Sequence, residues 1–332
     1  MKLEIVTPDE WNNLIYNFKR AHIPYGLSIN TTYVEARLDN GRKVQAFFNG
    51  QVKGVVNNGA IGGQFAKQAN FHRITEGYGR KEYWSNTAHK FKVKWNYKTA
   101  KGFTYIDEYY ADKELKCWSY DVSSSYAFAM LNPMPDTTKE PRYNDRVRKN
   151  EIGFYKEGTA TDEPGVYADI IFPLMDSPFK DYVMNYYHKK EKATEENNKL
   201  ERDKWKAFLN IPTGLLQKYN IFLRNAIVYY SNQYIKKFFD DNTIYCNTDS
   251  IVSLTPRPDI PIGNDIGQFK SEHNGESFKY KQEGIYQWSK ECHYKGVTGE
   301  NITDIDDISD WRDNFEYKLE GELLVKNEKK KR

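Results

Sequence analysis

The chain has 332 residues, 39% of them hydrophobic, which is enough for one large or two ordinary folded domains. Its three cysteines stand far apart, which excludes a disulfide framework and a zinc cluster built on paired cysteines. The formal net charge is +3, no apolar run approaches the roughly 20 residues that span a bilayer, and the first residues lack the apolar core of a secretory signal, so we expect a cytoplasmic protein without membrane contact.

The first hundred residues combine a predicted helix, PDEWNNLIYNFKRA (8–21), with strand-like runs such as TTYVEARL (31–38) and KVQAFF (43–48). Between positions 41 and 101 there are twelve basic residues and two acidic ones. Aromatic rings alternate with these cations, as at Lys92, Lys94 and Trp95. Cations for phosphates and flat rings for bases predict nucleic-acid binding. The alternative is a solvated β surface whose rings face a core.

The rest of the chain alternates between strand and helix patterns. CWSYDVSSSYAFAML (117–131) predicts a strand that runs into a helix, and GVYADIIF (165–172) predicts a second strand. Three helices are expected next, from about Phe179 to about Asn197, from about Lys199, and from about Asn220 to Phe239. TIYCNTDSIVSL (243–254) predicts two short strands around a polar tip. This order indicates an α+β fold with a largely antiparallel sheet.

Two aspartates lie at the ends of predicted strands. Asp121 follows the strand-like CWSY, and Asp249 lies at the tip of the predicted hairpin. Two carboxylates from separate strands can share Mg²⁺, which prefers oxygen ligands and usually keeps water and substrate phosphates as further ligands. The alternative for each aspartate is an ordinary helix cap or turn former.

The predicted helix from about Lys199 carries a possible phosphate-binding face. Lys206, Asn210, Thr213 and Gly214 have the spacing of one helix face, and Lys206 there can reach a triphosphate. Pro212 is expected to end or kink this helix just past Asn210. The alternative is an ordinary amphipathic helix with a lysine that extends into water.

Taken in this order, YDVSSSYAFAM, KAFLNIPTG and YCNTDS resemble three motifs of family B DNA polymerases, most closely those of the protein-primed branch found in small tailed phages. The resemblance covers about residues 101–300, and KGFTYIDEYY and GIYQW add two weaker matches in the correct order. The chain departs from the motifs at three positions. Asn247 replaces an Asp, Thr213 replaces a Tyr, and Gly284 replaces a Lys.

The resemblance implies a polymerase palm with an antiparallel sheet, helical fingers and a small thumb, joined to an uncharacterised N-terminal α+β region. The corresponding division of the chain is a basic and aromatic region with possible nucleic-acid binding (1–100), the first part of the palm (101–178), fingers helices (179–240), the catalytic hairpin of the palm (241–265), and the thumb with a basic tail (266–332).

The resemblance also implies roles for individual residues. Asp121, Asp249 and the Val122 carbonyl are expected to hold two Mg²⁺ ions, for which Mn²⁺ is expected to substitute. The nucleotide-binding residues expected are Ser123 and Ser124 through their amides, Tyr126 at the sugar, and Arg202, Lys206 and Asn210 on the predicted helix, with Lys206 also placed in catalysis. Arg202 is equally compatible with a surface ion pair to Glu195 or Glu201. Gly214, Thr248 and Tyr286, together with Lys92, Lys94 and Trp95, are expected to contact DNA.

The implied function is a template-directed DNA polymerase that adds dNTPs to a primer 3′-OH on a DNA template by a two-metal mechanism. No acidic Asp-x-Glu pattern of a proofreading exonuclease occurs in residues 1–100, so we expect synthesis without proofreading. The expected setting is phage or mobile-element replication, in the host bacterial cytoplasm if the chain is phage-encoded, with other replication proteins as further partners. Since Asn247 removes one negative charge, weaker Mg²⁺ binding is expected.

Two alternatives remain open at this point. The first is a catalytically weak or inactive, polymerase-derived subunit that binds DNA during replication. The second is a primase-like or terminal-transferase activity in the same core, which would synthesise without a primer or without a template.

Overall fold

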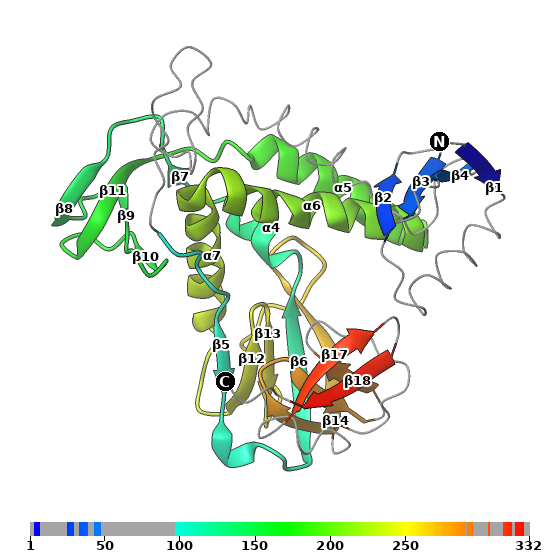
Figure 1. Ribbon diagram of the computed structural model, residues 1–332. Helices are drawn as coiled ribbons and strands as arrows, with labels where there is room; N and C mark the ends of the chain where they lie inside the picture. The colour runs from blue at the N-terminus through cyan, green and yellow to red at the C-terminus, as the bar shows by residue number, and fades with distance from the viewer. Residues whose placement is uncertain are drawn as a thin grey trace. The chain divides into compact units, whose positions relative to one another are not determined.

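The computed structural model describes residues 97–289 and 291–294, Ile305, and six further strands (Figure 1). These strands are β1 (Leu3–Val6), β2 (Tyr25–Ile29), β3 (Tyr33–Leu38), β4 (Lys43–Phe47), β17 (Phe315–Glu320) and β18 (Leu323–Glu328). β3 and β4 confirm the two strands predicted there. The helix predicted over 8–21 and the residues Lys92, Lys94 and Trp95 lie outside the described residues.

The chain divides into two compact units. The first comprises Met1–Asn57, Ile106–Cys117 and Gly275–Arg332, and the second comprises Asn58–Tyr105 and Trp118–Asn274. Two long strands, β6 (Leu115–Val122) and β14 (Phe269–Gln282), have residues in both units. All of the central functional residues described below belong to the second unit, except Tyr286.

The first unit contains a four-stranded sheet of order β1-β4-β3-β2, in which only the β1–β4 pair is parallel. The hairpin β17–β18 forms a separate two-stranded sheet. The later part of β14 pairs antiparallel with β15 (Ile285–Trp288), which pairs with β16 (Glu291–Tyr294). The short 3₁₀ helix η2 (Glu108–Tyr110) precedes β6, and the Asp107 carbonyl before it accepts the Tyr280 hydroxyl at 2.6 Å.

Within the described part of the chain, the α-helices belong to the second unit. These are α4 (Ser125–Ala129), α5 (Lys180–Glu195), α6 (Lys199–Tyr219) and α7 (Ile221–Lys236), close to the bounds predicted for the last three. α5 and α6 lie side by side, and α4 packs against α6 and α7 (Figure 1). Asn198 and Asn220 cap α6 and α7, since their side chains accept the N–H groups of Glu201 and Leu223.

Two groups of strands complete the second unit. One has the order β14-β6-β13-β12-β5 and contains β5 (Thr104–Ile106), β12 (Thr243–Asn247) and β13 (Ser250–Ser253). The other is an antiparallel sheet in which the long strand β11 (Tyr167–Met175) pairs with β7 (Met134–Pro135), β8 (Arg142–Arg146) and β9 (Glu151–Phe154), and β9 pairs with β10 (Ala160–Thr161). The strands predicted around positions 118, 168 and 248 are confirmed, and the fold is α+β with mainly antiparallel pairing.

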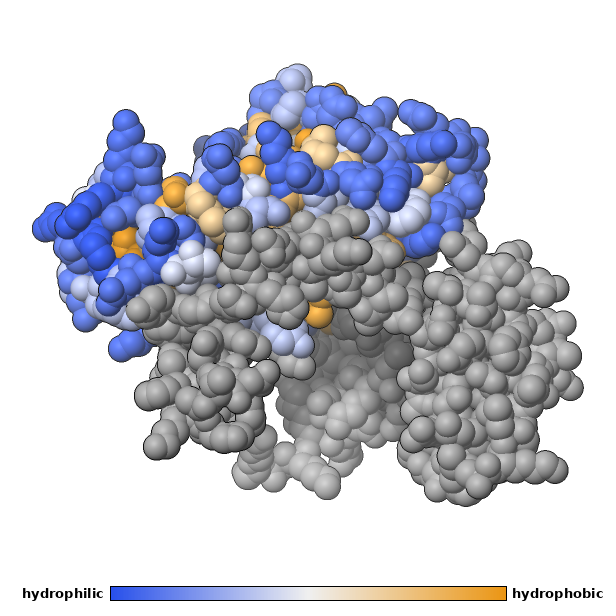
Figure 2. All heavy atoms as spheres, turned by 90° about the horizontal axis from the view of Figure 1, so that it is seen from above, coloured by the Kyte–Doolittle hydropathy of each residue, from blue (hydrophilic) through white to orange (hydrophobic). Residues whose placement is uncertain are grey.

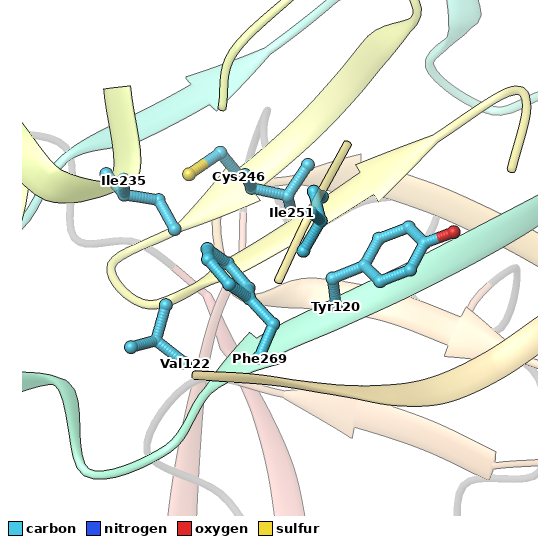
Figure 3. Close-up of a cluster of buried hydrophobic side chains, with 7 residues drawn as sticks. Tyr120, Val122, Ile235, Cys246, Ile251 and Phe269 are labelled. Carbon is cyan, nitrogen blue, oxygen red and sulfur yellow. The ribbon is translucent and has the colours of Figure 1, made fainter. Parts of the chain in front are cut away.

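A cluster of buried side chains lies beneath the β12–β13 hairpin (Figure 3). Tyr120 and Val122 come from β6, Cys246 from β12, Ile251 from β13, and Phe269 from β14. Ile235 reaches this cluster from α7. The aromatic and branched side chains that made these segments strand-like in the sequence therefore fix the hairpin on a rigid base.

Of the two outcomes expected at Pro212, an end of α6 does not occur, because the helix continues to Tyr219, and a kink stays a prediction. A proline has no N–H, so the carbonyl four residues earlier, that of Phe208, loses its helical partner. In this structure the buried Tyr182 hydroxyl of α5 donates to the Phe208 oxygen at 2.7 Å. The neighbouring helix thus supplies the hydrogen bond that the proline removes.

The described surface visible in Figure 2 is mostly hydrophilic, with apolar side chains only in small groups. Among the described residues, no helix combines the length and the apolar character needed to cross a bilayer.

Candidate active site

Asp121 and Asp249 lie on neighbouring strands. β6 pairs antiparallel with β13, which places Asp121 opposite Ser250, next to Asp249 in the chain. The Val122 N–H donates to the Asp249 carbonyl oxygen at 2.8 Å, so the backbones at the two aspartates are joined directly. Two residues that are 128 positions apart in the sequence are therefore held together by strand pairing.

Both carboxyl groups have raised pKa values. Burial, then the charges of Asp249 and Glu272, raises the pKa of Asp121 to about 8. Burial is also the main cause that raises the pKa of Asp249 to about 6, with a further contribution from Glu272. Lys206 lowers both values, and Lys270 lowers that of Asp121. Burial therefore outweighs the lysine charges and favours the protonated form of both carboxyl groups.

The tip of the hairpin is a tight three-residue turn. The Asp249 N–H donates to the Asn247 carbonyl at 2.8 Å, and Thr248 between them has φ 64°, a left-handed value that is unfavourable for a residue with a branched side chain. The Thr248 N–H donates to the Phe103 carbonyl at 2.7 Å. The strained turn is thus held from two sides, by Phe103 and by Val122.

The donor set of this turn fits a magnesium site that is completed by substrate. No cluster of three or more His, Cys, Asp or Glu side chains suitable for a metal occurs in the described part of the chain. Mg²⁺ needs fewer protein ligands than that, because it is commonly bound by one or two carboxylates together with water and substrate phosphates. Two half-buried carboxyl groups with raised pKa values form such a pair, since a bound cation would stabilise the charged forms that burial disfavours.

Three lysines act on one another at this site, and two of them also act on the aspartates. Lys206 of α6 and Lys270 of β14 act on the charge of Asp121, and both also act on Lys190 of α5. The Lys190 side chain is only 10% exposed, and its Nζ donates to Ser124 Oγ at 3.1 Å. Burial lowers the pKa of Lys190, while Glu191, 3.4 Å away, raises it. The lysines and aspartates together form a site with separate positive and negative sides.

Sequence reasoning identified Lys206 and missed Lys190, Lys270 and Glu272. A signal for Lys190 was present. The buried positions of α5 are Tyr182, Val183, Tyr186, Tyr187, Lys190 and Ala193, which form the apolar face of the helix. A lysine on such a face needs a polar partner inside the protein, and this marks it as a candidate for function. No comparable pattern in the sequence marks Lys270 or Glu272.

Ser123 and Ser124, the two serines predicted to bind phosphate, differ in whether their polar groups are already paired inside the protein. The Ser123 N–H donates to the Gln268 carbonyl at 2.8 Å, so in this structure it is already paired and does not point at an open anion site. Ser124 has φ 56° and precedes α4, and its hydroxyl accepts the hydrogen bond from Lys190. Ser124 is therefore the serine that lies on the lysine side of the site.

Tyr126 lies on α4 within reach of the same charges. Its ring is half-buried, with the Arg224 guanidinium of α7 at 5.6 Å from the ring centroid. Burial raises the pKa of Tyr126, the Arg224 charge lowers it, and the Asp249 charge raises it. Tyr126 is therefore within reach of the Asp249 charge, its contact with a nucleotide stays a prediction, and Arg224 is a neighbour that the sequence did not indicate.

On α6, fewer residues of the predicted phosphate-binding face are exposed than expected. Lys206, Asn210 and Gly214 are exposed, but Thr213 is only 4% exposed, because the second half of α6 packs against α4 and α7. The prediction that Thr213 shares that face is wrong. Arg202 pairs with Asp203 at 3.0 Å, a different acidic neighbour from the two that we considered.

The other residues predicted to contact DNA do not belong to one element of the fold. Thr248 is at the tip of the hairpin, with its N–H bonded to Phe103. Tyr286 lies on β15 in the first unit, where its ring stacks on His293 with centroids 4.6 Å apart. Lys92, Lys94 and Trp95 are not among the described residues.

Solved structures resemble this arrangement of strands and helices, whereas known sequences do not match the chain. No protein-family model and no curated protein sequence matches the chain. Among solved structures, phi29 DNA polymerase complexed with primer-template DNA is similar, with a TM-score of 0.54 and 13% identity, over 98% of this chain and 90% of that chain. The chain has a polymerase-like fold.

Two further structures agree. Phi29 DNA polymerase complexed with single-stranded DNA has a TM-score of 0.52 at 13% identity, over 87% of this chain and 82% of that chain. The ternary complex of the same polymerase with primer-template DNA and incoming nucleotide substrates has a TM-score of 0.50 at 14% identity, over 98% of this chain and 90% of that chain. At these identities the likeness is one of fold.

Proposed function

We propose that the protein is a template-directed DNA polymerase that transfers dNTPs to a primer 3′-OH, and that it is a reduced relative of the protein-primed family B enzymes. The observation that carries the proposal is the pairing of the Asp121 strand with the Asp249 turn, within reach of the charges of Lys206 and Lys270. The polymerase-like fold supports it. The partners proposed are a DNA primer-template, dNTPs and other replication proteins.

Asp121 and Asp249, with the Val122 carbonyl, are proposed to hold two Mg²⁺ ions, or Mn²⁺ in their place. Bound divalent ions would neutralise charge on the phosphates and favour ionisation of the attacking hydroxyl. In phosphoryl transfer, positioning and charge neutralisation supply most of the catalysis. The strained turn at Thr248 has the role of keeping the Asp249 carboxylate beside Asp121 before substrate arrives.

The lysine side of the site is proposed to receive the triphosphate. Lys206 is exposed on α6 and can move toward an incoming phosphate, whereas Lys190 is buried and held against Ser124. An anion bound beside them would be stabilised by both charges, and it would offset the mutual repulsion of the lysines that contributes to the lowered pKa of Lys190. Lys206 would also be placed to give a proton to the leaving pyrophosphate.

Tyr126 is proposed to contact the sugar of the incoming nucleotide, because it feels the charge of Asp249 and packs against the half-buried Arg224. Contacts of Asn210 and Arg202 with the nucleotide, and of Gly214, Thr248 and Tyr286 with DNA, also remain proposals. So do the palm, fingers and thumb divisions, the absence of proofreading, a role in phage or mobile-element replication, and a location in the bacterial cytoplasm.

Two observations favour a second function, a DNA-binding replication subunit with weak or no catalysis. Asn247 brings no charge to the turn, and its Oδ1 lies 3.4 Å from the Thr248 hydroxyl, within the turn itself. The Ser123 N–H, which a catalytic site would offer to phosphate, is bonded to Gln268.

Extension of a labelled primer on a DNA template, with Mg²⁺ and separately with Mn²⁺, tests the proposal. Wild type should extend, Asp121→Ala should not, and Asn247→Asp should lower the Mg²⁺ concentration needed for half-maximal rate, because it adds a carboxylate to the turn. Asp241→Asn is a suitable control, since Asp241 is an exposed acid before β12.

The binding-subunit reading replaces the polymerase if wild type binds the duplex but adds no nucleotide with either metal, and Asn247→Asp does not restore synthesis. Reactions without primer and without template belong to the same assay. Products there would indicate a primase-like or terminal-transferase activity instead.

A further inference from the structure

The segment from Lys98 to Phe103 is bound along helix α7 by two asparagines. Asn225 donates from Nδ2 to the Lys98 carbonyl at 3.0 Å and accepts the Ala100 N–H at 2.8 Å. Asn232 repeats the pattern, since it donates to the Lys101 carbonyl at 3.0 Å and accepts the Phe103 N–H at 2.7 Å. Each side-chain amide therefore bonds the segment as one residue of a neighbouring strand would.

The spacing of the two asparagines matches the spacing of their partners. Seven residues along an α-helix rise about 10.5 Å. Three residues of extended chain, the step from one bonded pair to the next, advance about 10 Å. The match explains why both amides can bind the same segment without distorting α7.

Asn232, the second asparagine, is linked to the tip of the β12–β13 hairpin by hydrogen bonds through a single residue, Phe103. Asn232 holds the N–H of Phe103, and the carbonyl of Phe103 accepts the N–H of Thr248 at 2.7 Å. Asp249 follows Thr248 directly. A continuous chain of hydrogen bonds therefore leads from helix α7 through Phe103 to the residue next to the Asp249 carboxylate.

Because Gly102 has no side chain, the segment 98–103 can lie close to Thr248 at the hairpin tip. A Cβ at position 102 would lie 2.7 Å from the Thr248 Oγ1 and 3.1 Å from its Cβ. Any larger residue would have to displace Thr248, whose φ of 64° already places the turn under strain. The geometry of Thr248 is thus set from the outside by the segment that Asn232 holds.

We infer that Asn232 is a positioning residue for the Asp249 carboxylate, acting through Phe103 and Thr248, while Asn225 anchors the same segment without reaching the site. The inference rests on the proposed metal-dependent function, because its consequence is the affinity of the aspartate pair for divalent cations. Residues that orient a metal ligand typically change metal affinity by about 10- to 100-fold when they are replaced.

The test is Mn²⁺ binding to the full-length protein without DNA, followed by electron paramagnetic resonance of the free ion. Asp121→Ala defines the binding that belongs to the site. Asn232→Ala should weaken that binding by about 10- to 100-fold. Asn225→Ala is the matched control, because it removes the same two kinds of hydrogen bond from the same segment, and it should change the affinity by less than about threefold. Thermal unfolding midpoints separate this effect from a general loss of stability.

A second pair of variants approaches the same contact from the other side. Gly102→Ala should weaken Mn²⁺ binding as Asn232→Ala does, and the double variant Gly102→Ala/Thr248→Gly should recover most of it, because glycine removes the clashing side chain and tolerates φ 64°. This pair decides the question if Asn232→Ala does not fold.

Equal effects of Asn232→Ala and Asn225→Ala, or no effect of Gly102→Ala, would overturn the inference. Wild type that shows no Asp121-dependent Mn²⁺ binding would reject both the metal site and the positioning role. Wild type that binds Mn²⁺ in this way but extends no primer would reject the polymerase proposal alone.

Discussion

Asp121 is a half-buried carboxyl group whose neighbours include two further acids, Asp249 and Glu272. Its pKa is raised to about 8 in the folded protein, against an ordinary value near 3.8. The folded protein therefore binds a proton at Asp121 more tightly than the unfolded chain does. As a result, the free energy of unfolding of the metal-free protein falls as pH rises from about 4 to about 8, and this loss is complete above that range.

Asp121→Asn should therefore raise the thermal midpoint of the metal-free protein at pH 9 by at least about 3 °C, because the neutral amide removes a buried charge from a negative site. At pH 5 the gain should nearly disappear, since the wild-type carboxyl is then protonated. Scanning calorimetry in a chelating buffer at both pH values is the measurement. Asp241→Asn, at an exposed acid, should show no such pH dependence. A gain of equal size at both pH values would contradict the assigned cause.

At the scale of single elements, a side chain of α5 supplies a hydrogen bond that the backbone of α6 lacks. Pro212 leaves the Phe208 carbonyl without a helical donor, and the Tyr182 hydroxyl takes that place. Both groups are buried, so loss of the hydroxyl would leave a carbonyl without a partner in the helix interior. This contact lies two residues beyond Lys206 on α6 and keeps the helix that carries this lysine continuous.

Tyr182→Phe should cost about 1–3 kcal/mol of stability in the wild-type background. It should cost clearly less in a Pro212→Ala background, where the new N–H at position 212 can bond to the Phe208 carbonyl. Urea unfolding of the four proteins in this cycle gives the coupling. Tyr187→Phe is the matched control. Its hydroxyl donates to the Asn264 carbonyl, away from α6, so its cost should be the same in both backgrounds. A cycle with no coupling would refute the role given to Tyr182.

At the scale of the whole molecule, neither compact unit is a continuous segment. The chain passes between them after residues 57, 105, 117 and 274. No simple truncation isolates the unit that holds the site, so the full chain is the proper object for binding measurements. The net charge of +3 conceals the surplus of basic residues between positions 41 and 101, and this surplus is expected to act on a polyanion.

Primer-template affinity should therefore fall with salt, by at least about tenfold between roughly 50 and 200 mM, with a linear dependence of log K on log salt concentration. Fluorescence anisotropy without divalent metal measures this. Asp121→Ala should bind with wild-type affinity at pH 7, because the Asp121 carboxyl of the metal-free protein is then mostly protonated. An affinity independent of salt would argue against phosphate contacts as the basis of binding.

The sequence by itself determined the local elements and the main candidates. Aromatic and branched residues around Asp121 and Asp249 predicted the strands, and helical periodicity predicted α5, α6 and α7, because these patterns depend on near neighbours in the chain. The short strands β7 to β10 were not predicted, since two to five residues without clear alternation give too weak a pattern.

Only the tertiary structure decided which residues meet. The approach of Lys270 to Asp121, the hydrogen bond from Lys190 to Ser124, the hydrogen bond that lets α6 pass through Pro212, and the link from Asn232 to Thr248 all join residues that are far apart in the sequence. Local periodicity carries no information about such partners. They follow from how strands pair and helices pack, and a side chain's hydrogen-bonding capacity is satisfied by whatever that packing brings within reach.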